Sequence, residues 1–383
     1  MLDLARQFAA LRSEILDAVA QVLDTQTLIL GPAAERFERE AALTCGTAHA
    51  VGCASGTDAL WLGMAAARIG PGDAVLTTPF SFFATVSSIL RAGATPILAD
   101  IDPCTFNLSP TAVEKSIAEL ARNRPELRLR AILPVHLYGQ CADVDALGAI
   151  CKQHDLLLLE DAAQAFGATW SGRPAGSLGD AAAFSFYPTK NLSAAGDAGL
   201  LTTSSPDLAE RARMLRSHGM RRRYTHDEVG WNTRLDGMQA AILSVKLGHL
   251  PAWNRRRVAL AARYDQLLTS TGLTAPAGST SVADGLVLPW VDARAGHVFH
   301  QYVVRVPERV ALREHLALHG ISSEIYYPIS LHQQPAVRDL FPGVHLPESE
   351  RAAREVLAIP VFPEMLDEEQ YRVVTAISSF FHG

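Results

Sequence analysis

One lysine of this chain stands where covalent chemistry is possible. Lys190 lies in FSFYPTKNL (184–192), after an apolar run that predicts a strand and beside the polar residues Ser185, Thr189 and Asn191. A neutral lysine amine can attack a carbonyl carbon, and it can also take up and release a proton. Most lysines are solvated surface charges, so the chemical interpretation of Lys190 requires partner residues.

Two adjacent carboxylates are the first candidate partners. Glu160 and Asp161 end the apolar run LLLLED (156–161), and Gln164 follows shortly after them. Neighbouring side chains of a strand point to opposite sides, so only one of the two carboxylates can face a ligand. The alternative is that the acid caps the next helix by accepting hydrogen bonds from free backbone N–H groups.

The turn SGTDAL (55–60) is the second candidate partner. It follows an apolar run and opens the helix-like stretch DALWLGMAAARI (58–69). The free N–H groups and the dipole of a helix start form an anion site, which suits a phosphate group. Many helices without a ligand also begin with Ser-Gly-Thr, so the motif gains meaning only together with Lys190 and Asp161.

The elements that must position these residues are strands alternating with helices. Between residues 50 and 203, short apolar runs alternate with longer amphipathic segments, which predicts an α/β fold with a wound, mostly parallel sheet. Strands covered on both faces carry their ligand-binding residues at the carboxyl ends. We expect seven strands, at 50–54, 74–78, 95–99, 131–136, 156–160, 181–186 and 199–203.

The rest of the chain predicts a connector and a smaller unit. The stretch from Met238 to Leu268 has a helical pattern with one apolar face and is long enough to join two domains. Beyond it come FHQYVVRV (299–306), the helix-like 311–320, SSEIYYPI (322–329) and a final amphipathic segment from Asp367. We expect a large domain at 1–250 and a small α+β domain at 251–383.

Composition excludes several classes of protein. The chain has 383 residues, of which 48% are hydrophobic and 19% charged, as in a folded globular protein. A net charge of −6 lacks the basic excess of a nucleic-acid binder, and no apolar run is long enough to span a membrane. We therefore expect a cytoplasmic protein with neither a nucleic-acid nor a membrane partner.

Other enzyme classes lack their sequence signatures here. Five cysteines without a CxxC pair predict neither a disulfide framework nor a zinc site, and no bound metal is expected. The chain also has no HExxH, no GxSxG and no GxGxxG after a strand, which argues against metal hydrolases, serine hydrolases and nicotinamide dehydrogenases.

The motifs together resemble one enzyme family. A phosphate cradle, a strand-end aspartate and a loop lysine occur in the order typical of fold-type I pyridoxal phosphate (PLP) enzymes. Nearly the whole chain is similar to the DegT-type, or StrS-like, nucleotide-sugar aminotransferases. The similar segments are LDLARQFAALRSEI (2–15), LILGP (28–32), SGTDAL, PVHLYGQCADVDAL (134–147), EDAAQAFGA (160–168), FSFYPTKNL, GWNTRLDGMQAAIL (230–243) and YPISLHQQPA (327–336).

The resemblance implies a role for each matching residue. Lys190 forms a Schiff base with the cofactor aldehyde and shuttles the proton, and Asp161 keeps the pyridine nitrogen protonated. The other implied cofactor contacts are Gly56, Thr57, Phe82, Gln164, Ser185 and Asn232, the last of these reaching the cofactor of a neighbouring subunit. The implied substrate contacts are Tyr326, Tyr327 and His332, for which a packed aromatic hairpin is the alternative. Arg234 is the implied contact to the carboxylate of the amino donor, with an interface salt bridge as the alternative.

The implied reaction moves an amino group from an amino acid, with glutamate the expected donor, to a keto group of a nucleotide-linked deoxy sugar. The cofactor alternates between PLP and pyridoxamine phosphate, and a homodimer shares its active sites. The sugar, its nucleotide and the choice between C3 and C4 stay open, because HLYGQ (136–140) resembles family members that aminate at C3 as well as some that aminate at C4, and a 3-keto sugar is only slightly favoured.

The family also contains alternatives. A pyridoxamine-dependent sugar dehydratase carries histidine in place of the lysine, so Lys190 argues against that activity. A non-catalytic regulatory homologue would bind cofactor or sugar without turnover. Two departures from the common pattern, Ala198 in GDAG (196–199) and Trp231 in place of tyrosine, affect the expected loop geometry and substrate fit.

Overall fold

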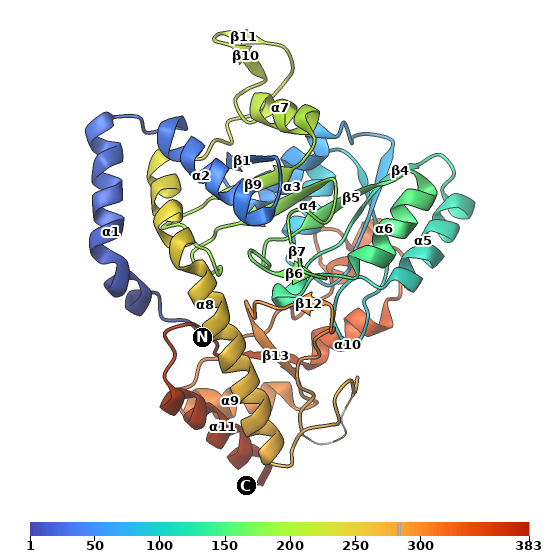
Figure 1. Ribbon diagram of the computed structural model, residues 1–383. Helices are drawn as coiled ribbons and strands as arrows, with labels where there is room; N and C mark the ends of the chain where they lie inside the picture. The colour runs from blue at the N-terminus through green and yellow to red at the C-terminus, as the bar shows by residue number, and fades with distance from the viewer. Residues whose placement is uncertain (282, 284, 383) are drawn as a thin grey trace.

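A seven-stranded sheet forms the centre of the larger part of the molecule (Figure 1). The computed structural model describes residues 1–281, 283 and 285–382. The strands, in spatial order, are β1 (His49–Cys53), β9 (Gly199–Thr203), β8 (Ala181–Ser185), β5 (Leu157–Asp161), β4 (Arg128–Leu133), β2 (Asp73–Thr77) and β3 (Thr95–Leu98). Strand β9 pairs antiparallel with both β1 and β8, and the other strand pairs of this sheet are parallel. All seven expected strands are present, so the predicted fold class is confirmed.

Helices cover both faces of this sheet. One face packs against α3 (Gly56–Ala66), α4 (Ala84–Arg91) and α7 (Pro206–Leu215). The other face packs against α2 (Gly31–Cys45), α5 (Pro110–Asn123), α6 (Val144–His154) and the first half of α8 (Gly237–Ser270). Successive strand residues such as Leu200 and Leu201 therefore belong to opposite hydrophobic clusters. Burial on both faces explains why the strands are nearly continuous apolar runs.

The long helix α8 joins the two cores of the molecule. It spans 34 residues with Pro251 inside, close to the expected range of 238–268. Leu243 near its start packs in the cluster beneath the large sheet, whereas Tyr264 and Leu268 pack in the core of the C-terminal part. In Figure 1 the helix runs along the side of the molecule from one part to the other. The expected connector is therefore present.

The C-terminal part is a smaller α+β unit. Strand β13 (Tyr302–Arg305) pairs antiparallel with β14 (Val356–Ile359), and helices α9 (Arg309–Leu318) and α11 (Asp367–His382) pack on this pair. The remaining short elements are α10 (Pro347–Glu355), β6 (Thr169–Trp170), β7 (Arg173–Pro174), β12 (Ala295–Gly296), the hairpin β10–β11 (Met220–Arg222 and Thr225–His226) and three 3-10 turns at Leu137–Gly139, Leu331–Gln333 and Arg338–Leu340.

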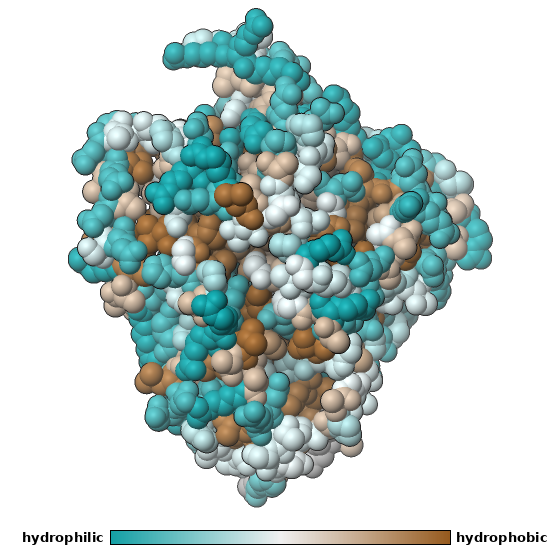
Figure 2. All heavy atoms as spheres, viewed as in Figure 1, coloured by the Kyte–Doolittle hydropathy of each residue, from teal (hydrophilic) through white to brown (hydrophobic). Residues whose placement is uncertain are grey.

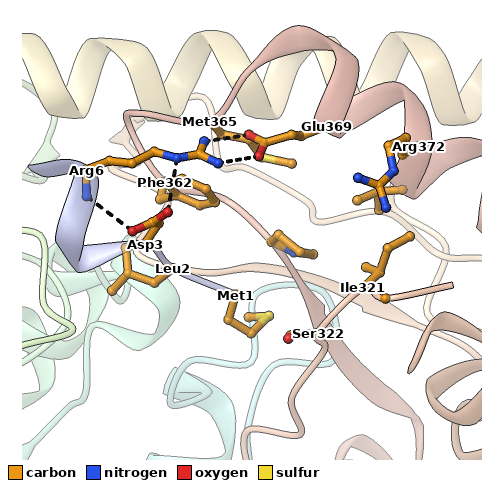
Figure 3. A pocket seen from close by; sticks show the side chains of 13 residues that line it. Met1, Leu2, Asp3, Arg6, Ile321, Ser322, Phe362, Met365, Glu369 and Arg372 are labelled. Atoms are coloured by element: carbon orange, nitrogen blue, oxygen red, sulfur yellow. Dashed lines mark hydrogen bonds and ion pairs between the residues drawn. The ribbon is translucent and has the colours of Figure 1, made fainter. Parts of the chain in front are cut away.

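The start of the chain is tied to this C-terminal unit. Helix α1 (Leu4–Thr25) begins at the capping residue Asp3, and Arg6 in its first turn forms two hydrogen bonds of 2.9 and 2.7 Å to the carboxylate of Glu369 on α11. Figure 3 shows this ion pair beside a small cavity that Met1 and Leu2 help to line. The expected large domain (1–250) and small domain (251–383) are therefore in direct contact through Arg6 and Glu369. The domain boundary at residue 250 stays a proposal.

The structure adds three facts about cysteines, metals and membranes. Four of the five cysteines are buried and Cys104 is half-buried, and all five are free thiols. Within the described residues, no group of three or more His, Cys, Asp or Glu side chains could hold a metal ion. No helix in the same residues has the length and apolar character needed to cross a membrane.

A glycine contact between β9 and α3 generates a testable prediction. A Cβ atom on Gly199 would lie 2.2 Å from the Ser55 carbonyl oxygen, whereas a Cβ on Gly148 inside α6 would meet nothing within 4 Å. Gly199→Ala should lower the free energy of unfolding by about 1–3 kcal/mol through overpacking. The matched control Gly148→Ala should be neutral or raise it by up to about 1 kcal/mol through helix propensity. Thermal melting checks both, and equal melting temperatures would contradict the contact.

Candidate active site

A cavity of about 720 Å³ opens at the carboxyl ends of the central strands, between the large sheet and the C-terminal unit. Strand β5 brings Asp161 to it, the end of β8 brings Ser185, and the first turn of α3 brings Gly56 and Thr57. Eight of the residues singled out in the sequence line this one cavity: Gly56, Thr57, Phe82, Asp161, Gln164, Ser185, Lys190 and Tyr326. The ligand edge expected from the fold class is thus where the candidate residues converge.

The two carboxylates that end β5 face opposite sides. Asp161 lines the cavity, where its Oδ2 accepts a hydrogen bond of 2.8 Å from the Thr85 hydroxyl. Glu160 points away and accepts backbone N–H groups of the 176–179 turn at 2.8 Å, with His136 Nε2 at 3.0 Å. Glu160 therefore stabilises the 176–179 turn, whereas Asp161 is the carboxylate that can contact a ligand in the cavity.

Burial shifts the pKa of the Asp161 carboxyl group. Desolvation raises the pKa of this carboxyl above its ordinary value. The Thr85 hydroxyl, the Ala163 N–H group and the positive charge of Lys190 oppose this rise by stabilising the ionised form. A buried carboxylate with a cation beside it is a common arrangement in catalytic sites.

Lys190 lines the same cavity as Asp161. Desolvation by the cavity walls lowers the pKa of its ammonium group to about 8, while the negative charge of Asp161 acts in the opposite direction. The pKa of Lys246 is also lowered to about 8 by burial, but this lysine donates to Ser193 and does not line the cavity. Lys190 is therefore the lysine with both an accessible amine and a lowered pKa.

Helix α8 holds the loop that carries Lys190. Three side chains spaced along one side of the helix bind alternate loop residues: Gln239 Oε1 accepts from the Ala195 N–H at 2.8 Å, Lys246 Nζ donates to Ser193 Oγ at 3.0 Å, and Asn254 Oδ1 accepts from Asn191 Nδ2 at 2.9 Å. The lysine is thus anchored to the helix that connects the two cores.

The start of α3 forms an anion-binding end of the cavity. Ser55 caps the helix by accepting the Asp58 N–H at 3.1 Å, which leaves the N–H groups of Gly56 and Thr57 without a partner within the helix. A Cβ atom on Gly56 would lie 2.6 Å from Ser185 Cβ, so glycine lets the serine hydroxyl approach the helix start. These N–H and hydroxyl donors suit a phosphate group.

Aromatic and amide groups form another part of the cavity wall. Gln164 Oε1 accepts the Tyr138 N–H at 2.6 Å, and Gln164 Nε2 donates to the Tyr327 hydroxyl at 3.1 Å. The Phe82 ring remains 60% exposed beside Tyr327, with the ring centroids 6.2 Å apart. A planar ligand ring can therefore stack on Phe82.

Sequence reasoning missed two residues that line or support the cavity. His300 contributes to its wall, and the Thr85 hydroxyl donates a hydrogen bond to Asp161. Tyr327 was expected beside the sugar site, together with Tyr326, from the family-like C-terminal segment, and it does line the cavity. No local pattern around Thr85 or His300 separates them from ordinary core residues.

Three of the candidate residues lie outside this cavity within one chain. Asn232 is exposed and forms a backbone bridge with Ser217 beyond the β10–β11 hairpin. Arg234 is half-buried beside the end of β1. His332 is buried, with Nε2 3.0 Å from a Glu350 carboxylate oxygen.

Comparisons with known proteins agree with this geometry. A relative from Geobacillus stearothermophilus, named pleiotropic regulatory protein, is 45% identical and matches 100% of this chain and 98% of its own length. The UDP-N-acetyl-3-dehydro-alpha-D-glucosamine 3-aminotransferase of Acidithiobacillus ferrooxidans is 41% identical with the same coverage, 100% and 98%. The crystal structure of S. venezuelae DesV in complex with a ketimine intermediate has a TM-score of 0.92 and 42% identity, covering 100% of this chain and 98% of that one.

The family model described as the DegT/DnrJ/EryC1/StrS aminotransferase family matches residues 9–378. This match covers nearly the whole chain, and the relatives above share its full length at more than 40% identity. The family resemblance noted in the sequence is therefore confirmed, and the protein belongs to the DegT/DnrJ/EryC1/StrS aminotransferase family.

Proposed function

We propose that this protein transfers an amino group from an amino acid to the keto group of a nucleotide-linked deoxy sugar, with pyridoxal phosphate as cofactor. The observation that carries the proposal is the meeting of Lys190, Asp161 and the anion-binding start of α3 in one cavity. The name of the A. ferrooxidans relative, an aminotransferase acting on a UDP-linked sugar, supports the substrate class.

The residues present fit the proposed cofactor. The donors at Gly56, Thr57 and Ser185 would hold its phosphate, and Phe82 would stack on its ring. Gln164 would hydrogen-bond beside the ring oxygen, and Asp161 would face the ring nitrogen. When bound, the cofactor supplies a carbonyl carbon that accepts an amine and a ring that accepts electrons from the reacting carbon.

The chain itself supplies proton transfer and charge. With a pKa of about 8, the Lys190 amine is partly neutral near neutral pH, so it can accept a proton from the reacting carbon and return it. Asp161 provides the negative charge that keeps a ring nitrogen protonated. We propose these two residues as the catalytic pair.

The remaining partners are also part of the proposal. Glutamate is the proposed amino donor, and the sugar would contact Tyr326 in the segment that the C-terminal unit contributes to the cavity. Arg234 and His332 lie outside the single-chain cavity, so substrate contact by either residue would require a rearrangement or a second subunit. We therefore place the sugar beside Tyr326.

We propose a homodimer with shared active sites, which would account for the position of Asn232. This residue is exposed at the base of the β10–β11 hairpin, which projects from the molecule as a hydrophilic arm (Figure 2). Asn232 makes no contact with the cavity of its own chain, so we propose that it donates to the phosphate in the neighbouring subunit. A two-fold dimer would complete both sites with one repeated contact.

The regulatory alternative has one specific point in its favour. The G. stearothermophilus relative, 45% identical, carries the name of a regulatory protein. Against a purely non-catalytic role stands the complete set of Lys190, Asp161 and Gln164 lining a single cavity. Amine transfer by the purified protein separates the two functions.

The proposed function predicts a specific transfer reaction. Purified protein supplied with PLP, ¹⁵N-glutamate and a panel of 3-keto and 4-keto nucleotide sugars should place ¹⁵N on one sugar, as seen by mass spectrometry. Lys190→Ala should reduce the rate by roughly several orders of magnitude, because the proton carrier and the covalent anchor are lost together. The control Lys152→Ala, which changes an exposed lysine of α6, should leave the rate unchanged.

Reduction of the PLP-loaded protein with borohydride locates the anchor in the same preparation. Peptide mapping should find the cofactor on Lys190. Cofactor on Lys246, or bound cofactor without transfer from any amino donor to any sugar of the panel, would contradict the assignment.

The shared-site dimer generates a second prediction. Asn232→Ala should weaken PLP binding about tenfold, because a hydrogen bond to a charged phosphate is lost. When Lys190→Ala and Asn232→Ala subunits are mixed at limiting PLP and allowed to exchange, one site of each mixed dimer is wild type at both positions. Activity should then partly return. Mixed dimers that form but stay inactive would place both residues in the same subunit's site.

A further inference from the structure

A chain of two buried hydroxyl groups leads to the Asp161 carboxylate. Thr85, in the first turn of α4, is fully buried, and its Oγ1 lies 2.8 Å from Asp161 Oδ2. Ser81 is also buried, and its Oγ lies 2.8 Å from Thr85 Oγ1. Ser81 and Asp161 both line the cavity, whereas Thr85 lies between them in the protein interior.

The charge of Asp161 determines the direction of these hydrogen bonds. An ionised carboxylate can only accept, so Thr85 must donate its one hydroxyl hydrogen to Asp161 and can then accept from Ser81. If Asp161 is protonated, the same atoms allow the reverse direction, with the carboxyl group donating to Thr85. The hydroxyl pair therefore satisfies both states but stabilises the charged one more, since hydrogen bonds to an ion are stronger.

Few other groups compensate the buried charge. Lys190 and Tyr327 line the same cavity as Asp161, and His136, three residues beyond the end of β4, donates its backbone N–H to the Asp161 carbonyl oxygen at 2.9 Å. The charges of Lys190 and His136 lower the pKa of Asp161. The only other hydrogen bond that Asp161 side-chain oxygens accept in the described residues is from the Ala163 N–H, at 3.3 Å. The Thr85 hydroxyl is the closest of these donors, and it binds Oδ2 whereas Ala163 binds Oδ1.

We propose that Thr85, supported by Ser81, is a positioning residue that keeps Asp161 ionised and fixes the orientation of its carboxylate in the cavity. The proposal rests on the proposed function for its consequence, since Asp161 would act on the cofactor's ring nitrogen. Thr85 itself does not line the cavity and acts only through Asp161.

The cofactor-free protein provides the first test. Thr85→Val keeps the shape of the side chain but removes the donor, and Thr85→Ser keeps the donor. Burial already raises the pKa of Asp161, so its ionisation disfavours folding as the pH rises, and loss of the donor should raise this pKa further. As the pH rises through the pKa of Asp161, the melting temperature of Thr85→Val should therefore fall increasingly below that of the wild type, and the difference should become constant once Asp161 is ionised in both proteins, whereas Thr85→Ser should follow the wild type.

The same substitution in an Asp161→Asn background separates positioning from packing. An asparagine has no charge to stabilise, so the loss caused by Thr85→Val should there be independent of pH. An equal, pH-independent loss in both backgrounds would overturn the proposal. If the valine variant does not fold, Ser81→Ala provides the test, with a smaller effect of the same sign expected because it acts one hydrogen bond further away.

Cofactor binding provides the second test and distinguishes two kinds of failure. Thr85→Val should weaken PLP binding about tenfold, through misorientation and neutralisation of Asp161, and Thr85→Ser should restore most of it. Thr85→Val could lose stability in a pH-dependent way while both Thr85→Val and Asp161→Asn bind PLP as tightly as the wild type. That result would confirm the effect of the hydroxyl pair on Asp161 but refute the role of Asp161 toward the cofactor.

Discussion

The site depends on the cost of keeping the Asp161 carboxylate ionised in a buried position. Desolvation raises its pKa and also lowers that of Lys190 to about 8, so burial disfavours the charged form of both groups. Each charge opposes the shift of the other, and the Thr85 hydroxyl adds a hydrogen bond to the anion. The result is a carboxylate that can remain charged beside an amine that can lose its proton near neutral pH.

The fold holds these groups in place from two directions. Coverage of both sheet faces leaves the carboxyl ends of the strands as the open edge, and β5 delivers Asp161 there while Glu160 binds the 176–179 turn behind it. The lysine loop is held from the side by α8, whose far end lies in the second core. The C-terminal unit then closes the cavity with Tyr327.

Sequence patterns predicted the parts of this arrangement that depend on local chain features. The seven apolar runs became the seven strands, and Lys190, Asp161 and the start of α3 converge because strand ends of one sheet share an edge. Thr85 and His300 were missed because an ordinary helix start and an ordinary extended stretch carry them, and only tertiary packing brings them to the site. Asn232, which lies outside the single-chain cavity, was singled out by family resemblance alone.

The coupling of Lys190 with Asp161 can be measured directly on the cofactor-free protein. Competitive labelling of lysine amines with a limiting acylating reagent across pH 6–11, followed by mass spectrometry, gives a titration curve for each lysine. The Lys190 curve should have its midpoint near pH 8, and Asp161→Asn should move it to lower pH because a charge that raises this pKa is removed. A midpoint above pH 10, or a curve that Asp161→Asn leaves unmoved, would contradict the account.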